Sequence, residues 1–143
     1  MHQIGLIALA SGLFAQVIKV VVTLLRDKRF QPALLVATGG MPSSHTSLVT
    51  TLSLLVARRE GVDSPLFSVV LIFSLYVVFE ATGLRQEVGK QATILNDLVD
   101  ELFTKHHVDH RRLRELVGHT WAEVGGGFLC GLGVYFVAWH FWI

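Results

Sequence analysis

Residues 4–25 read IGLIALASGLFAQVIKVVVTLL, 22 residues whose apolar pattern is interrupted only by Gln16 and Lys19. A helix that spans a bilayer needs about 20 mostly apolar residues, so this stretch predicts a spanning helix. It has no basic segment in front of it and exceeds the apolar part of a signal peptide, which favours an anchor that is retained. The run ends at four charged residues, 26–29. The stretch therefore predicts an integral membrane protein.

The composition of the whole chain agrees with this class. Of the 143 residues, 52% are hydrophobic and 16% charged, whereas soluble domains carry roughly 25% charged residues. The net charge of +1 creates no field that would attract nucleic acid, so no nucleic-acid partner is expected. The single cysteine, Cys130, excludes an internal disulfide, and no zinc-binding pattern is present. We expect neither a metal nor another cofactor.

Three further apolar segments follow, at 43–57, 66–84 and 120–143. Between the last two, residues 85–117 hold most of the remaining charge and predict an amphipathic, interfacial segment. The last span contains five glycines, which would let neighbouring helices approach closely. The sequence thus predicts an all-α fold, a single membrane domain over residues 1–143 with about four transmembrane helices.

Basic residues are distributed unevenly over the two sides that four spans would define. The side on which the first span ends carries nine of them, Arg26, Lys28, Arg29, Arg85, Lys90, Lys105, Arg111, Arg112 and Arg114. The opposite side has only Arg58 and Arg59. Because short cytoplasmic loops carry the excess of Lys and Arg, we expect the first side to be cytoplasmic and both termini to lie outside.

A polar stripe runs along the first span towards this basic side. Its members, Gln16, Lys19, Thr23 and Arg26, recur every three or four residues and so share one helical face. A lysine inside a span costs about 2.5–3.5 kcal/mol on insertion scales and indicates a functional site. The alternative is that Lys19 extends to the surface and Arg26 marks the membrane edge.

A second feature on the same side is the run Gly39-Gly40-Met41-Pro42-Ser43-Ser44-His45. It predicts a loop that enters a helix capped by Ser43 or Ser44. The N–H groups at such a helix start favour an anion, and His45 would lie beside it. An ordinary capped helix with a solvent-facing histidine is the alternative.

The third feature is the spacing of four between His119 and Glu123, which places both on one face of the last span. A carboxylate there can hold one imidazole nitrogen and leave the other as a nucleophile or base. A purely structural hydrogen bond is the alternative. Cations at Lys19, Arg26 and Arg85, a helix start and two histidines together indicate a phosphate-sized anion and phosphoryl transfer.

These residues resemble a known superfamily. The patterns Lys19-x6-Arg26, Pro42-Ser43-Ser44-His45 and His119-x3-Glu123 are similar to the three ordered motifs of type 2 phosphatidic acid phosphatases and vanadium haloperoxidases. The glycine-rich run before His45, the segment at 80–85 and the residues around His119 resemble the small divergent branch of that superfamily.

The resemblance implies a role for each residue. Lys19 and Arg26 would bind phosphate oxygens, and Ser44 would add a hydrogen bond. His45 would protonate the leaving alkoxide, His119 would attack phosphorus, and Glu123 would orient His119, without a metal. The Ser-Arg pair expected six residues before that histidine is absent, since Leu113 stands there. Arg85 or Arg114 would replace its arginine.

Two functions follow as expectations. One is a membrane phosphatase that hydrolyses a lipid-linked or small phosphate monoester through a phosphohistidine, in a bacterial or organelle membrane, with its site on the cytoplasmic face. The other is a non-catalytic relative that binds an anionic headgroup or acts as a scaffold. Membrane lipid is the expected partner in both, and a homo-oligomer stays open. Residues 106–110 (HHVDH) are a weaker candidate for a metal site.

Overall fold

The computed structural model describes residues 2–28, 40–103 and 119–142, and within these ranges it contains five helices and no strand. The helices are α1 (His2–Asp27), α2 (Ser44–Glu60), α3 (Pro65–Thr82), α4 (Leu84–Phe103) and α5 (Trp121–Trp142). The predicted all-α class is confirmed, and α1, α2, α3 and α5 coincide with the four apolar segments.

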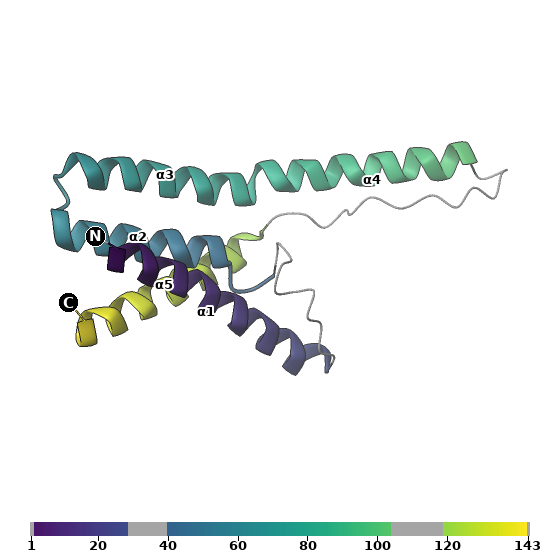
Figure 1. The fold of residues 1–143 in the computed structure, drawn as a ribbon. Coiled ribbons are helices and arrows are strands. Elements are labelled where there is room, and N and C mark those ends of the chain that lie inside the picture. Colours follow the sequence, from purple (N-terminus) through teal and green to yellow (C-terminus); the bar gives the residue numbers. More distant parts are fainter. Residues whose placement is uncertain (1, 29–39, 104–118, 143) are drawn as a thin grey trace.

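The centre of the bundle is α2, which contacts α1, α3 and α5 (Figure 1). Both chain termini lie at the end of the bundle where α2 passes into α3, while α1 runs towards the opposite end (Figure 1). The turn between α2 and α3 needs Gly61, whose φ of +85° is a conformation that L side chains rarely adopt. Ser64 then caps α3 by accepting a hydrogen bond from the Phe67 amide.

The packing has the polarity expected in lipid, with large apolar side chains outside and hydroxyl groups inside. Leu13, Ile72 and Phe141 are each about 70% exposed, whereas Ser11, Ser47 and Thr51 are fully buried. Because lipid offers no hydrogen bonds, buried hydroxyls must pair between helices. Ser11 Oγ lies 2.7 Å from Ser47 Oγ, and Thr51 Oγ1 donates to Ser11 Oγ at 2.8 Å. These bonds join α1 to α2.

The helices α2 and α5 touch through backbone. Gly127 and Gly131 face α2 so closely that an added Cβ would lie 2.8 Å from Thr46 Cβ and 2.5 Å from the Ser47 carbonyl oxygen, respectively. The expected role of the glycines is therefore confirmed for these two, whereas Gly125 and Gly133 face open space. The Thr51 hydroxyl also lies 3.0 Å from the Gly131 carbonyl oxygen, within hydrogen-bond distance, which brings α5 against α2.

Three stretches of the described chain are long and apolar enough to cross a membrane: Gln3–Arg26, Pro65–Asp100 and Trp121–Phe141. The fourth predicted span, α2, has only 17 residues and is rich in hydroxyls, so four crossings stay a prediction. The 36 residues of Pro65–Asp100 run from α3 into α4. Figure 1 shows α4 extending beyond the other helices, where the sequence predicts an interfacial segment.

Candidate active site

Lys19 lies on α1, and its side chain is almost fully buried, with 1% of its surface exposed. The ammonium donates a hydrogen bond of 3.1 Å to Gln16 Oε1, one turn earlier on the same helix. Gly40 crosses the aliphatic stem of Lys19, since a Cβ on Gly40 would lie 3.4 Å from Lys19 Cδ. The lysine is thus enclosed by its own helix and by the start of the loop that leads to α2.

The same loop ends in a capped helix start. Ser43 is fully buried, and its hydroxyl accepts from the Thr46 amide at 3.3 Å, so Ser43 is the N-cap of α2. Ser44 is the first helical residue and His45 the second. Because the amide groups of a first helical turn carry a partial positive charge, His45 stands where an anion is favoured. Of the two serines considered as caps, the structure selects Ser43.

His119 and Glu123 form the third part of the site, at the start of α5. His119 is 1% exposed, and its Nδ1 lies 3.0 Å from Glu123 Oε2. A carboxylate accepts the hydrogen bond, so Nδ1 carries the proton and Nε2 is left as the basic nitrogen. The predicted pairing of these two side chains is therefore present in the structure.

Glu123 also caps its own helix. The Thr120 amide donates to Glu123 Oε2 at 3.0 Å, and the Glu123 amide donates to Thr120 Oγ1 at 3.3 Å. This reciprocal arrangement is a capping box, which fixes the start of a helix. One carboxylate oxygen thus holds both the helix start and the imidazole, so the orientation of His119 depends on where α5 begins.

Two backbone hydrogen bonds bring these helix ends together. The Ser43 amide donates to the Glu123 carbonyl at 3.0 Å, which links α2 to α5, and the His119 amide donates to the Ala81 carbonyl at 3.0 Å, which links α5 to α3. As a result, the ring centroids of His45 and His119 lie 6.0 Å apart. Lys19 is connected to these helix ends through Gly40, which lies against its aliphatic stem and precedes Ser43 by three residues.

This arrangement combines the parts that phosphate chemistry needs. A cationic side chain and a helix start can bind phosphate oxygens. An imidazole oriented through Nδ1 can act as a nucleophile, and a second imidazole nearby can exchange a proton. Lys19, His45, His119 and Glu123 come from segments up to 104 residues apart, and the fold gathers them at one end of the bundle.

Of the other residues predicted for the site, the structure describes the side chains of two, Arg26 and Ser44. Arg26 is exposed in the last turn of α1, and Ser44 is half-buried. Arg85 belongs to α4, but its side chain and all of Arg114 lie outside the described residues, as do residues 106–110. In the part of the chain that the structure describes, no group of three or more His, Cys, Asp or Glu side chains could hold a metal ion.

Sequence reasoning missed the contacts that assemble the site. The carbonyl groups of Ala81 and Glu123 act through the backbone and leave no side-chain signature. The sequence predicts Ser43 only as a possible helix cap, whereas in the structure its amide also joins α2 to α5. The signal that was available is the Thr120-x-x-Glu123 spacing, which is typical of a capping box.

Comparisons with known proteins agree with the resemblance found in the sequence. Residues 1–134 match the model of a family described as the divergent PAP2 family. The chain is 41% identical over 136 residues to a protein of Bacillus subtilis (strain 168) named uncharacterized membrane protein YuiD, and the match covers 87% of this chain and 86% of that relative. No solved structure matches the chain.

Proposed function

This chain belongs to the divergent PAP2 family, and we propose that it is an integral membrane phosphatase that hydrolyses a lipid-linked or small phosphate monoester. The observation that carries the proposal is the buried His119, held by Glu123 through Nδ1 at 3.0 Å with the His45 ring 6.0 Å away. A nucleophile, its orienting group and a second proton-transfer group are thereby adjacent.

The first step forms a phosphohistidine. Nε2 of His119 attacks phosphorus, the bond between phosphorus and the ester oxygen breaks, and His45 in its protonated form gives its proton to the departing oxygen. The alcohol leaves, and the phosphoryl group stays on His119. This sequence replaces one difficult displacement by two easier ones, as covalent catalysis does generally.

The second step restores the enzyme. His45, now neutral, takes a proton from a water molecule while the water oxygen attacks phosphorus. The bond between phosphorus and Nε2 breaks, and inorganic phosphate is released. Lys19 and the first amides of α2 stabilise the charge on the phosphoryl oxygens in both steps, because preorganised charges act strongly where water is excluded. Glu123 keeps Nδ1 protonated throughout.

A second function, a non-catalytic protein that binds an anionic headgroup, is favoured by one feature. Leu113 stands where the third motif of the superfamily has the Ser-Arg pair. The capping box gives Glu123 a structural role that a binding protein would also need. Binding a phosphate requires Lys19 and the helix start but not the nucleophile, so the two functions differ in what the loss of His119 does.

The deciding experiment is phosphate release by the purified protein from phosphatidate, phosphatidylglycerophosphate, an isoprenyl phosphate and an aryl phosphate. We expect the wild type to hydrolyse at least one, and an acid-labile phosphoenzyme to form from a 32P-labelled ester. His119→Ala should abolish both signals. His140→Ala is the matched control, because His140 is an exposed histidine in the last turn of the same helix. Phosphate binding without release by the wild type would instead establish the non-catalytic function.

A further inference from the structure

Thr120 lies between His119 and the first residue of α5, and all three of its polar groups are engaged. Its amide donates to Glu123 Oε2 at 3.0 Å, and its hydroxyl accepts from the Glu123 amide at 3.3 Å. Its carbonyl accepts from the Val124 amide at 3.1 Å. Thr120 is therefore the N-cap of α5, and Glu123 is the third residue of that helix.

The carboxylate that Thr120 holds is the one that orients His119. Glu123 Oε2 accepts from the Thr120 amide and also lies 3.0 Å from Nδ1 of His119. The Glu123 side chain is 20% exposed and has several rotatable bonds, so packing encloses it only in part and its hydrogen bonds have to fix its direction. The placement of the first turn of α5 therefore decides whether Oε2 meets Nδ1.

The Thr120 hydroxyl holds this first turn in place. The amides at the start of a helix have no partner within the helix, and a capping side chain supplies the acceptor that one of them lacks. Here that amide belongs to Glu123 itself. Thr120 is exposed, so its side chain acts through this hydrogen bond rather than through packing. Loss of the hydroxyl would let the first turn fray and would withdraw the carboxylate from Nδ1.

The position of the imidazole proton has a chemical consequence. A neutral imidazole carries one proton and one basic nitrogen. While Glu123 accepts from Nδ1, the basic nitrogen of His119 is Nε2, which is the nucleophile of the proposed mechanism. Once the carboxylate withdraws, the proton distributes over both nitrogens, and a His119 ring protonated at Nε2 cannot attack phosphorus.

We propose that Thr120 is a positioning residue for the nucleophile: its hydroxyl fixes the first turn of α5 and, through Glu123, keeps the proton of His119 on Nδ1. The effect on turnover rests on the proposed function, whereas the position of the proton is a property of the protein alone. Because Thr120 acts through Glu123 and not on the substrate, its loss should lower kcat and leave KM nearly unchanged.

The first test measures the position of the proton by 15N NMR of histidine-labelled protein in detergent, at about pH 9, above the range in which histidines ordinarily titrate. His119→Gln identifies the signals of His119. In the wild type we expect Nδ1 to be protonated and Nε2 to be unprotonated. In Thr120→Val, which keeps the shape of the side chain but lacks the hydroxyl, the proton should be shared between the two nitrogens. Thr120→Ala removes the same acceptor and provides a second variant, and circular dichroism establishes that each is folded.

Two conservative replacements separate capping from any other role of the hydroxyl. Thr120→Ser keeps a hydroxyl, Thr120→Asn supplies an amide oxygen, and both residues cap helices at least as well as threonine. Both should show the wild-type proton position and turnover. Thr120→Val should lower kcat for an aryl phosphate about tenfold, less than the roughly 100-fold that a full 1 Å misplacement can cost. If serine restores turnover and asparagine does not, the hydroxyl acts on the substrate directly and the inference is wrong.

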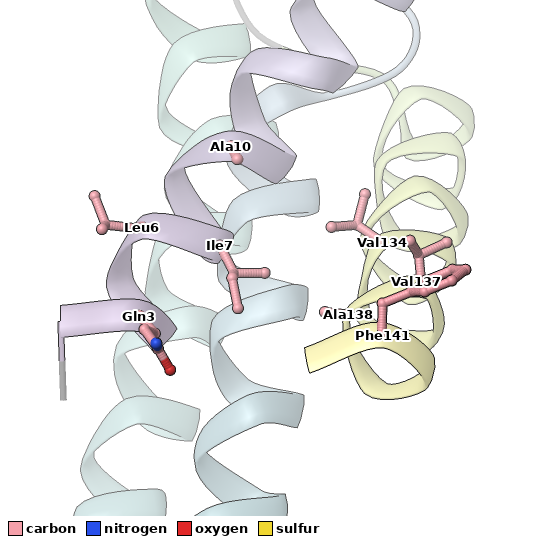
Figure 2. A pocket seen from close by; sticks show the side chains of 8 residues that line it. All are labelled: Gln3, Leu6, Ile7, Ala10, Val134, Val137, Ala138 and Phe141. Carbon is pink, nitrogen blue, oxygen red and sulfur yellow. The ribbon is translucent and has the colours of Figure 1, made fainter. Parts of the chain in front are cut away.

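Two controls lower stability without changing the start of α5. Ser64 caps α3 at the opposite end of the bundle by accepting from the Phe67 amide at 3.1 Å, so Ser64→Ala removes an equivalent cap. Val134 lines an apolar cavity of about 490 Å³ between α1 and α5 (Figure 2). It follows Glu123 by 11 residues, about 16 Å along the helix axis, so Val134→Ala weakens packing on α5 far from the cap. Both controls should keep the wild-type kcat and the proton of His119 on Nδ1.

The outcomes separate this inference from the proposed function. If the wild type releases phosphate from no ester, the proposed function fails, and the NMR signals alone decide whether Thr120 sets the position of the proton. If Thr120→Val keeps the proton on Nδ1, or if the two controls move it to the same extent, the inference is overturned while the phosphatase stands. A moved proton with an unchanged kcat would overturn the positioning role.

Discussion

The close contact between α2 and α5 can be tested by adding a single methyl group. In Gly127→Ala the new Cβ would overlap the Ser43 carbonyl and lie 2.8 Å from Thr46 Cβ, whereas ordinary contact begins at 3.4 Å. The two helices must therefore separate by at least about 0.6 Å. The 3.0 Å hydrogen bond from the Ser43 amide to the Glu123 carbonyl would lengthen towards about 3.6 Å, beyond a normal hydrogen bond.

The energetic consequence has two parts of opposite sign. Replacing glycine by alanine inside a helix stabilises it by about 1 kcal/mol, while overpacking a close contact costs about 1–3 kcal/mol. The upper value applies, because the atoms that Cβ meets belong partly to the backbone of α2 and cannot rotate away. We expect Gly127→Ala to lower the free energy of unfolding by about 2 kcal/mol.

The same displacement should reduce turnover, because the contact joins the helix ends that carry His45 and Glu123. A misplacement of about 1 Å can cost on the order of 100-fold in rate, so we expect at least a tenfold loss for the smaller shift here. Stability is measured by circular dichroism during titration of detergent-solubilised protein with dodecyl sulfate, and turnover by phosphate release.

Gly133→Ala is the matched control on the same helix, because a Cβ at position 133 meets no atom within 4 Å. It should be at least as stable as the wild type and fully active. If Gly127→Ala matches Gly133→Ala in both measurements, the contact does not position the site and the reasoning is refuted.

Three further predictions concern orientation and the site itself. Cysteines introduced as Lys28→Cys and Asp63→Cys, the latter at an exposed position of the turn between α2 and α3, should react with a membrane-impermeant maleimide from the cytoplasm and from outside, respectively, in keeping with the basic-residue asymmetry. Labelling of position 28 from outside would reverse the topology. Lys19→Met should abolish turnover without impairing membrane insertion, which removal of the charge makes easier; normal turnover would exclude a role in phosphate binding. His45→Ala should retain much of its activity on an aryl phosphate whose phenol is a good leaving group, while losing about 10²–10⁴-fold on alkyl esters. His119→Ala should be inactive on both, and substantial aryl phosphatase activity in this variant would make His119 structural.

The apolar helices were predictable from sequence because the lipid requirement acts on each segment separately. A run such as 4–25 must be apolar whatever its neighbours are, and α1 extends only two residues beyond that run at each end. The motif resemblance was likewise readable, and the family match confirms it. The pairing of His119 with Glu123 followed from their spacing of four, since residues one turn apart share a face.

Relations between segments were not predictable in the same way. Nothing in the local sequence around Ala81 indicates that its carbonyl receives the His119 amide, because every residue has a carbonyl. The glycines of α5 look alike in sequence, yet Gly127 meets α2 and Gly125 borders an open groove. These differences arise from how far α5 is rotated against α2, which is set by packing over its whole length.

The hydroxyl network among Ser11, Ser47 and Thr51 bears on how the protein is made. Isolated in lipid, α2 would expose six serine and threonine side chains in 17 residues, so its own hydropathy gives it little tendency to partition into the bilayer. Ser11 on α1 offers the first partners for these groups, and α1 precedes α2 in synthesis. We therefore expect α1 to stay beside the translocon channel until α2 has been synthesised, so that the two helices enter the lipid as a pair.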